Sequence, residues 1–175
     1  MARIIYKEGC EGQNTLESIE GIEIDLLNGQ KALIYPKYSE EVMLPMENIK
    51  YYGQEPDTEI AALKETESEC LTDALHDCGS PAAEFVHKFR SDKYGRFHLP
   101  TLIAAMELQD QKSDIDELAE TIEGADLLRD FTSNIWSCSR HLKFYAWVAI
   151  GGSGFATYYD YLYSSYLAVP VVLYR

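Results

Sequence analysis

The sequence has no long apolar run, and this argues against a membrane-spanning helix. No stretch approaches the roughly 20 apolar residues that an α-helix needs to cross a bilayer. The segment from Met1 to Glu8 turns polar after two isoleucines, so it lacks the apolar core of a signal peptide. We therefore expect no membrane insertion. We also expect a chain that stays in the cytoplasm of its producer or leaves without such a signal, inside a virion or for display on a surface.

Basic residues are scarce. The chain has 15 Lys and Arg against 29 Asp and Glu, which gives a formal net charge of −14. Nucleic-acid binding needs clustered Lys and Arg to contact phosphates, and anionic membrane surfaces attract the same residues. The composition therefore argues against both partners, and the acidic excess mainly favours solubility and self-repulsion.

Cysteine is also scarce for a chain of 175 residues. The widely spaced cysteines are Cys10, Cys70, Cys78 and Cys138. Wide spacing in a long chain without an export signal predicts free, partly buried thiols rather than a disulfide framework. There is no Cys-x-x-Cys pair, and the histidines are scattered at His76, His87, His98 and His141. The sequence therefore predicts neither a metal site nor another cofactor.

What the sequence does contain is a hydrophobic fraction of 46%, enough for one real core. Residues 1–55 are predicted to form a small β-rich lobe. Asn28-Gly29 supplies the positive φ angles of a two-residue hairpin turn. Counting back from this turn, the cross-strand pairs are Leu26 with Lys31, Ile24 with Leu33, and Ile22 with Tyr35. A short strand from Val42 to Leu44 and a turn over Gly53 to Asp57 complete the predicted lobe.

The middle of the chain is predicted to be helical. Apolar residues recur with helical spacing from Leu71 to Cys78, and Gly79 stands where a left-handed cap is wanted. Ser80-Pro81 and Pro100-Thr101 each begin a further helix. The last predicted helix has a capping box at Ser113-Asp114-Ile115-Asp116 and ends at Gly124.

The composition changes after Ile135. Beyond that point Asp160 is the only acid, whereas seven of the 13 tyrosines lie at or after Tyr145. Aromatic and β-branched stretches flank a glycine turn at residues 151–154, which predicts twisted strands joined by a hairpin. The nearly continuous apolar run from Leu167 to Tyr174 predicts one buried strand.

A series of motifs follows a fixed order in the second part of the chain. They are Gly95-Arg-Phe-His-Leu-Pro-Thr101, Trp136-Ser-Cys-Ser139, Tyr145-Ala-Trp147, the glycine turn and Val169-Pro-Val-Val-Leu173. In order and approximate spacing, the chain from about Leu71 to Arg175 resembles the bacterial domain family found at the end of the Legionella collagen-like protein and in the Fibrobacter major-paralogous domains.

The resemblance implies a C-type-lectin-like fold, related to the formylglycine-generating-enzyme type. It is also similar to the variable proteins of diversity-generating retroelements, whose C-terminal strands display residues varied by mutagenic reverse transcription, and this implies a phage or bacterial origin. Two departures mean that family contacts must be remade: Phe97-His98 replaces Trp-Arg, and Val169 replaces Arg. We expect an α+β protein in which the small lobe precedes a C-type-lectin-like domain over residues 56–175.

The C-terminal tyrosines and the segment from Ser139 to Tyr145 are predicted to form a ligand-binding surface. Tyrosine offers a rigid apolar ring and a polar tip at low entropic cost, as in antibody loops. The segment has no helical or strand period, so we expect a loop, in which Arg140 offers a fork for a carboxylate or amide. The predicted binding residues are Ser139, Arg140, His141, Leu142, Phe144, Tyr145, Phe155, Thr157, Tyr158, Tyr159, Tyr161, Tyr163 and Tyr166.

Three alternatives compete with this interpretation. The tyrosines can be ordinary strand residues that partly pack inward, and the loop an ordinary solvated turn. The tyrosine-rich face can be a subunit interface of a phage or surface assembly. Cys138 beside His141 suggests a nucleophile and base, but no second cysteine is close in sequence. Trp136 and Trp147 are expected in the core. We therefore expect a binder of protein or glycan rather than an enzyme. An N-terminal lobe that assembles the chain into a homo-oligomer would raise its avidity.

Overall fold

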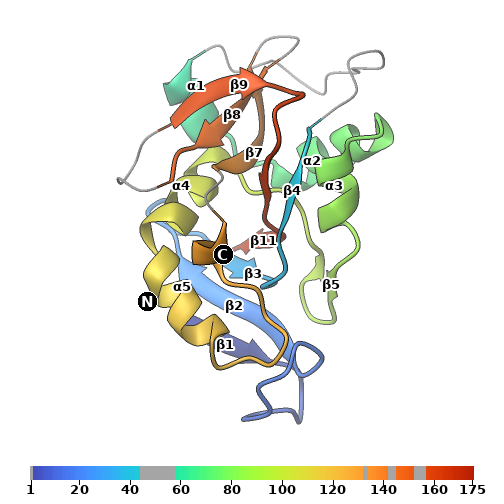
Figure 1. The fold of residues 1–175 in the computed structure, drawn as a ribbon, viewed down its shortest axis with the longest axis vertical. Coiled ribbons are helices and arrows are strands. Elements are labelled where there is room, and N and C mark those ends of the chain that lie inside the picture. The colour runs from blue at the N-terminus through green and yellow to red at the C-terminus, as the bar shows by residue number, and fades with distance from the viewer. Residues whose placement is uncertain (1, 44–57, 132–133, 142–144, 152–156) are drawn as a thin grey trace.

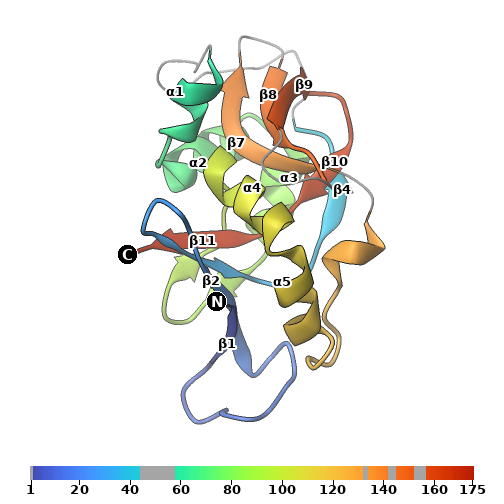
Figure 2. The same cartoon turned by 90° about the vertical axis from the view of Figure 1, so that its left-hand side faces the viewer.

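The computed structural model describes residues 2–43, 58–131, 134–141, 145–151 and 157–175, and these form an α+β fold. Five α-helices and three sheets occur among them. Strands β7 to β9 lie at the top of the view in Figure 1, and β1 to β3 lie toward the bottom. Helices α4 (Leu102–Asp110) and α5 (Lys112–Ala119) follow one another along both sheets, as the turned view in Figure 2 shows.

Two sheets carry the fold, and each joins strands that are far apart in sequence. The four-stranded sheet is antiparallel and consists, in order, of β1 (Arg3–Tyr6), β2 (Ile19–Asp25), β3 (Lys31–Ile34) and β11 (Val171–Tyr174). The five-stranded sheet has the order β4 (Ser39–Glu41), β10 (Tyr166–Ala168), β7 (Ile135–His141), β8 (Tyr145–Ala149) and β9 (Thr157–Tyr161). Only the β10–β7 pair among them is parallel. A small hairpin pairs β5 (Arg90–Ser91) with β6 (Gly95–Arg96).

These pairings cross the domain boundary predicted at residues 55–56. Strand β3 pairs with β11, and β4 pairs with β10. The boundary itself, like the predicted turn over 53–57, falls in residues 44–57, outside the described residues. The division into two domains therefore stays a prediction.

The hairpin between β2 and β3 exists, but its predicted register was wrong by one residue. Ile22 pairs with Ile34 and Ile24 with Ala32, while the amide of Leu26 donates to the carbonyl of Gln30 over 2.9 Å. The connection is therefore a three-residue loop with Gly29 at a φ of 80°, rather than a two-residue turn. Just after this hairpin, strand β4 lies at Ser39–Glu41 and ends before the short strand expected from Val42 to Leu44, of which Leu44 falls outside the described residues.

Three predicted helix boundaries are confirmed, and one unpredicted helix is present. Helix α2 (Ser68–Asp77) is followed by Gly79 in a left-handed conformation, with a φ of 79°. Helix α3 (Pro81–Val86) has Ser80 as its N-cap, and α4 has Thr101. A further helix, α1 (Glu59–Leu63), begins at a Thr58 cap.

The predicted capping box of α5 was wrong. The helix begins earlier, after Gln111, and no side chain caps it. The carboxylate of Asp116 instead accepts hydrogen bonds from the amides of Leu128 and Arg129, at 2.6 and 2.9 Å. A short polar side chain often satisfies backbone donors in this way. Here the donors, Leu128 and Arg129, belong to the segment that follows the helix rather than to the helix itself.

The two C-terminal predictions of local structure also need correction. The run from Leu167 to Tyr174 is two strands, β10 and β11, which belong to different sheets and are separated by Val169-Pro170. Proline has no amide hydrogen to donate to a sheet, which explains the break. The first residues of the predicted loop, Ser139 to His141, complete strand β7.

Glu23 anchors the β1–β2–β3–β11 sheet from a buried position, and its ionisation should stabilise the fold. Its carboxylate accepts hydrogen bonds from Arg3 at 2.8 Å, from Lys31 at 2.9 Å and from the hydroxyl of Tyr174. Burial raises the pKa of Glu23, but these three donors outweigh burial, so the pKa lies below its ordinary value of 4.5.

A folded-state pKa below the unfolded one gives stability that is fully present above the unfolded pKa and lost as the pH falls. Glu23→Gln should therefore lower the free energy of unfolding by about 1–2 kcal/mol at pH 7. The difference from wild type should shrink as the pH falls below 4.5. Urea denaturation between neutral and acid pH measures both quantities. The control is Asp25→Asn on the same strand, whose ion pair with Lys31 is longer, at 3.9 Å. If the difference in the free energy of unfolding between Glu23→Gln and wild type does not change with pH, the lowered pKa of Glu23 is contradicted.

Candidate functional site

The tyrosine-rich strands β8 and β9 lie at one end of the five-stranded sheet. Their antiparallel register places Tyr145 opposite Tyr161 and Trp147 opposite Tyr159. Because side chains alternate between the two faces of a strand, these four rings share one face. The pairing thus brings together residues that the sequence places in separate motifs.

His141, at the end of β7, joins those rings to form what we call the aromatic cluster: His141, Tyr145, Trp147, Tyr159 and Tyr161. Its centre is Tyr159, whose ring centroid lies 3.9 Å from that of His141 and 5.6 Å from those of Tyr145 and Trp147. Tyr145 and Tyr161 are 5.0 Å apart. Most of these pairs are tilted or edge-to-face, the arrangements that aromatic quadrupoles favour.

The aromatic cluster has a buried base and an exposed rim. His141 and Trp147 are each 6% exposed, whereas Tyr159 and Tyr161 are 47% and 43% exposed. Tyr163, which follows β9, is 46% exposed. The buried base packs against the half-exposed tyrosine rings, so these rings have less conformational freedom to lose on binding than isolated side chains would.

The opposite face of β9 carries a polar network around Asp160, the one acid of the C-terminal region. The hydroxyl of Tyr166 donates to the Asp160 carboxylate, and that of Tyr158 is hydrogen-bonded to Tyr166. Burial raises the pKa of Asp160, but hydrogen bonds from Tyr166, the Tyr161 amide and others outweigh it, so the pKa is lowered. Asp160 is thus ionised near neutral pH and locks β9 to β10.

The structure separates the predicted binding residues into three groups. The first group is half-buried or exposed and consists of Tyr145, Thr157, Tyr158, Tyr159, Tyr161, Tyr163 and Tyr166. Ser139, Arg140 and His141 are buried in strand β7. Leu142, Phe144 and Phe155 lie outside the described residues. A binding role for any of them stays a prediction.

The two tryptophans occupy the expected environment, whereas only Cys10 and Cys78 are partly buried as predicted and Cys70 is exposed. Trp136 is fully buried and Trp147 nearly so, which confirms both as core residues. All four cysteines are free. Cys138 is buried, and burial raises the pKa of its thiol far above the ordinary value. A thiol held protonated is a poor nucleophile.

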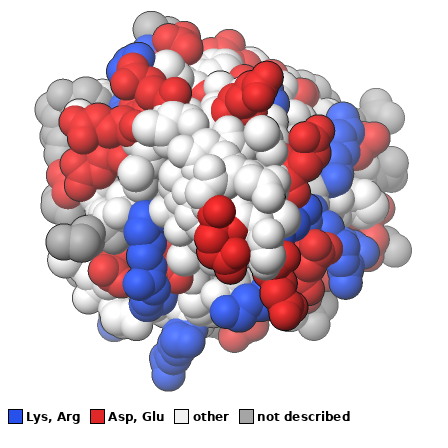
Figure 3. Space-filling model, turned by 90° about the horizontal axis from the view of Figure 1, so that it is seen from below, with Lys and Arg blue, Asp and Glu red and all other residues white. Residues whose placement is uncertain are grey.

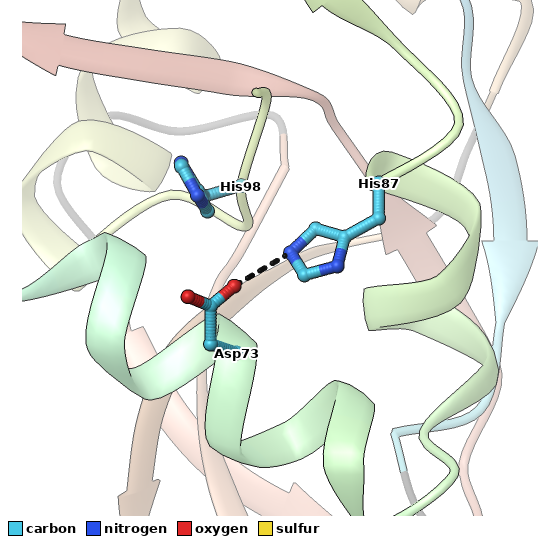
Figure 4. Close-up of side chains that lie close together, drawn as sticks. All are labelled: Asp73, His87 and His98. Carbon is cyan, nitrogen blue, oxygen red and sulfur yellow. Dashed lines mark ion pairs between the residues drawn. The ribbon is translucent and has the colours of Figure 1, made fainter. Parts of the chain in front are cut away.

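A second group of polar residues was missed by the sequence analysis. Asp73 lies in α2, His87 directly follows α3, and His98 precedes α4. Figure 4 shows their side chains around a common point. Burial, together with neighbouring His76, lowers the pKa of His87 to about 4. No short-range spacing in the sequence signals this group, because the tertiary fold alone brings its members together.

Charge is mixed on the face shown in Figure 3, where acidic and basic side chains surround an uncharged area. This view shows no continuous basic stripe of the kind that tracks a nucleic-acid backbone. Among the described residues, no helix has the length and apolar character required to traverse a lipid bilayer.

Comparison of the chain with protein-family models, with curated proteins and with solved structures found no match. The fold is therefore described as α+β, and the resemblance to C-type-lectin-like domains stays a prediction.

Proposed function

We propose that this chain is a non-enzymatic ligand-binding protein, of receptor or adhesin type, that recognises a protein or glycan through its tyrosine-rich C-terminal surface. The observation that carries the proposal is the aromatic cluster, in which Tyr159 and Tyr161 are 47% and 43% exposed above a buried base. Exposed tyrosines in a rigid group are typical of recognition surfaces, because each ring adds contact area and each hydroxyl a directed hydrogen bond.

The motifs behind the family resemblance contact one another, which supports a C-type-lectin-like fold. The amide of Cys138 in β7 donates to the carbonyl of Pro100 over 2.8 Å. Residues of separate motifs, Leu99, Trp136 and Ala146, are fully buried in one cluster. Three of the motifs therefore pack together in one cluster, and this packing supports the proposed fold.

The same resemblance supports a role as a variable protein of a diversity-generating retroelement in a phage or bacterium. Such a role needs a framework that tolerates surface changes. The Trp136 and Trp147 side chains fill the core, whereas Tyr159, Tyr161 and Tyr163 project from it. Changes at Tyr161 and Tyr163 would alter the proposed binding surface and leave Trp136 and Trp147 in place, whereas a change at Tyr159 would also remove its contacts with His141 and Trp147.

The function can be tested by probing a glycan array and an array of bacterial surface proteins with the labelled full-length chain. We expect wild-type protein to bind at least one feature. The double variant Tyr159→Ser/Tyr161→Ser should lose roughly tenfold or more of that affinity, because central aromatic residues dominate binding energy. The matched control is Leu27→Ser, which removes an exposed apolar side chain, 74% exposed, from the β2–β3 hairpin.

Two results would overturn the proposal. One is the absence of binding on both arrays, and the other is equal binding by the double variant and wild type.

The second candidate function, a subunit of a phage or surface assembly, is favoured by the position of β9 at the end of its sheet, where a strand can pair with another chain. Sedimentation velocity separates the candidates: an assembly subunit would be oligomeric as wild type and monomeric as the double variant.

A further inference from the structure

Asp73, His87 and His98 place three metal-binding side chains together on a part of the fold distinct from the aromatic cluster. One ligand atom from each residue lies within 4.8 Å of the other two. The Nε2 atom of His87 is 3.3 Å from Oδ1 of Asp73. Two ligands bound at about 2.0–2.1 Å to a tetrahedral Zn²⁺ are roughly 3.4 Å apart, so this pair already has the required separation.

The buried polar atoms of this group lack hydrogen-bond partners. Within the described part of the chain, neither ring nitrogen of His87 has a hydrogen bond, although its side chain is only 6% exposed. Oδ1 of Asp73 is likewise buried without one, because its 3.3 Å contact with Nε2 of His87 lacks hydrogen-bond geometry. Native proteins seldom leave such atoms unsatisfied. A bound cation would satisfy the carboxylate and the imidazole at once.

The backbone holds the third ligand in place. His98 exchanges two backbone hydrogen bonds with Val171 of β11, at 2.8 and 2.9 Å. Its side chain is close enough to Glu69 and Asp73 to interact with both carboxylates electrostatically. These acids favour a positive charge beside His98. The half-exposed guanidinium of Arg96 lies 3.9 Å from Oδ1 of Asp73 and partly neutralises the charge of that carboxylate. It can turn to solvent when a metal ion takes its place.

One side of the group opens to a cavity of about 300 Å³. His98 and Arg96 line it together with Glu67 and Glu69. An ion held by two histidines and one aspartate has at least one position left in its coordination shell. The cavity gives water or a small external ligand a path to that position.

We propose that Asp73, His87 and His98 form a binding site for a divalent transition-metal ion of the zinc class, with a remaining coordination position that faces the cavity. Two imidazoles and a carboxylate suit Zn²⁺, whereas Mg²⁺ and Ca²⁺ prefer oxygen ligands throughout. Because the ligands come from α2, the end of α3 and the segment before α4, the ion would also cross-link these elements. The site is independent of the proposed ligand-binding function.

The test uses the full-length, tag-free chain, stripped of metal with a chelator and titrated with Zn²⁺ in a calorimeter. We expect one ion per chain, unaffected by excess Mg²⁺, and a rise in Tm. Co²⁺ should give the visible absorption of a tetrahedral site. His87→Gln and Asp73→Asn should each weaken Zn²⁺ binding by more than the roughly 10–100-fold that the loss of an outer-shell partner costs.

Controls make the result specific. Asp77→Asn removes an exposed carboxylate, 85% exposed, from the same helix and should leave Zn²⁺ binding unchanged. Asp73 is itself 47% exposed, so Asp73→Asn should fold even if His87→Gln does not, and circular dichroism checks both. The proposal is overturned if wild-type protein binds no Zn²⁺, or if folded Asp73→Asn binds it as tightly as wild type does.

Discussion

Trp136→Ala should lower the free energy of unfolding by about 3–5 kcal/mol, the usual cost of removing a fully buried large aromatic side chain. The Trp136 side chain is 0% exposed and packs at the centre of a cluster with Leu71, Leu99 and Val148. Its indole Nε1 donates a hydrogen bond to the carbonyl of Glu41 over 2.8 Å, which ties β7 to the end of β4. The substitution would therefore leave a cavity and remove a hydrogen bond to the carbonyl of the half-buried Glu41.

Chemical denaturation monitored by circular dichroism measures this loss. Trp136→Phe is the matched control, because it keeps an aromatic ring near Tyr166, now 4.9 Å from the indole, and removes the N–H donor. We expect the control to lose about 1–3 kcal/mol. A loss below about 1 kcal/mol in the alanine variant would show that this position is not the core of the sheet.

Gly21→Ala should be comparably damaging, with a loss of about 3–5 kcal/mol from overpacking and backbone strain combined. Gly21 lies in β2 at a φ of 155°, next to a register shift in the β1–β2 pair. A Cβ atom there would lie 2.5 Å from the carbonyl oxygen of Ile34 and 3.0 Å from Cγ of Leu33. The contact is with backbone of the neighbouring strand, so relief requires β2 and β3 to separate.

Gly29→Ala separates the two causes of that loss. Gly29 has a φ of 80°, but nothing lies within 4 Å of its added Cβ. This control should lose only about 1–2 kcal/mol, the cost of the left-handed conformation. Thermal or urea denaturation of both variants measures the difference. Equal losses would contradict the assigned contact with Ile34.

Much of the fold could be predicted from local chemistry. Caps act over a few residues, so Ser80 and Thr101 correctly marked helix starts. The hairpin register could not be predicted in the same way. A one-residue shift moves every side chain to the other face, but Ala32, Leu33 and Ile34 are all fully buried, so neither face of β3 is polar. Apolar alternation therefore could not distinguish a two-residue turn from a three-residue loop.

The candidate sites show the same limit. The tyrosine alternation predicted rings on both faces of β9, and Tyr159 and Tyr158 do lie on opposite faces. Sequence could not show that Ser139 and Arg140 are buried, because their burial depends on strands and helices far away in the chain. Nor could it show that His87 and His98 meet Asp73, since the three belong to different segments with no common spacing.

The pairing of β3 with β11 has a consequence for synthesis in the cell. Ile34 and Val171 are neighbours in the sheet, yet the ribosome adds the whole intervening chain between them. At typical bacterial to eukaryotic elongation rates this takes on the order of ten seconds. During that time the nascent β2–β3 hairpin has an open, apolar edge that can pair with other chains. We therefore expect chaperones bound at the ribosome to bind the early hairpin. When β11 pairs with β3 and covers this edge, both sheets are complete.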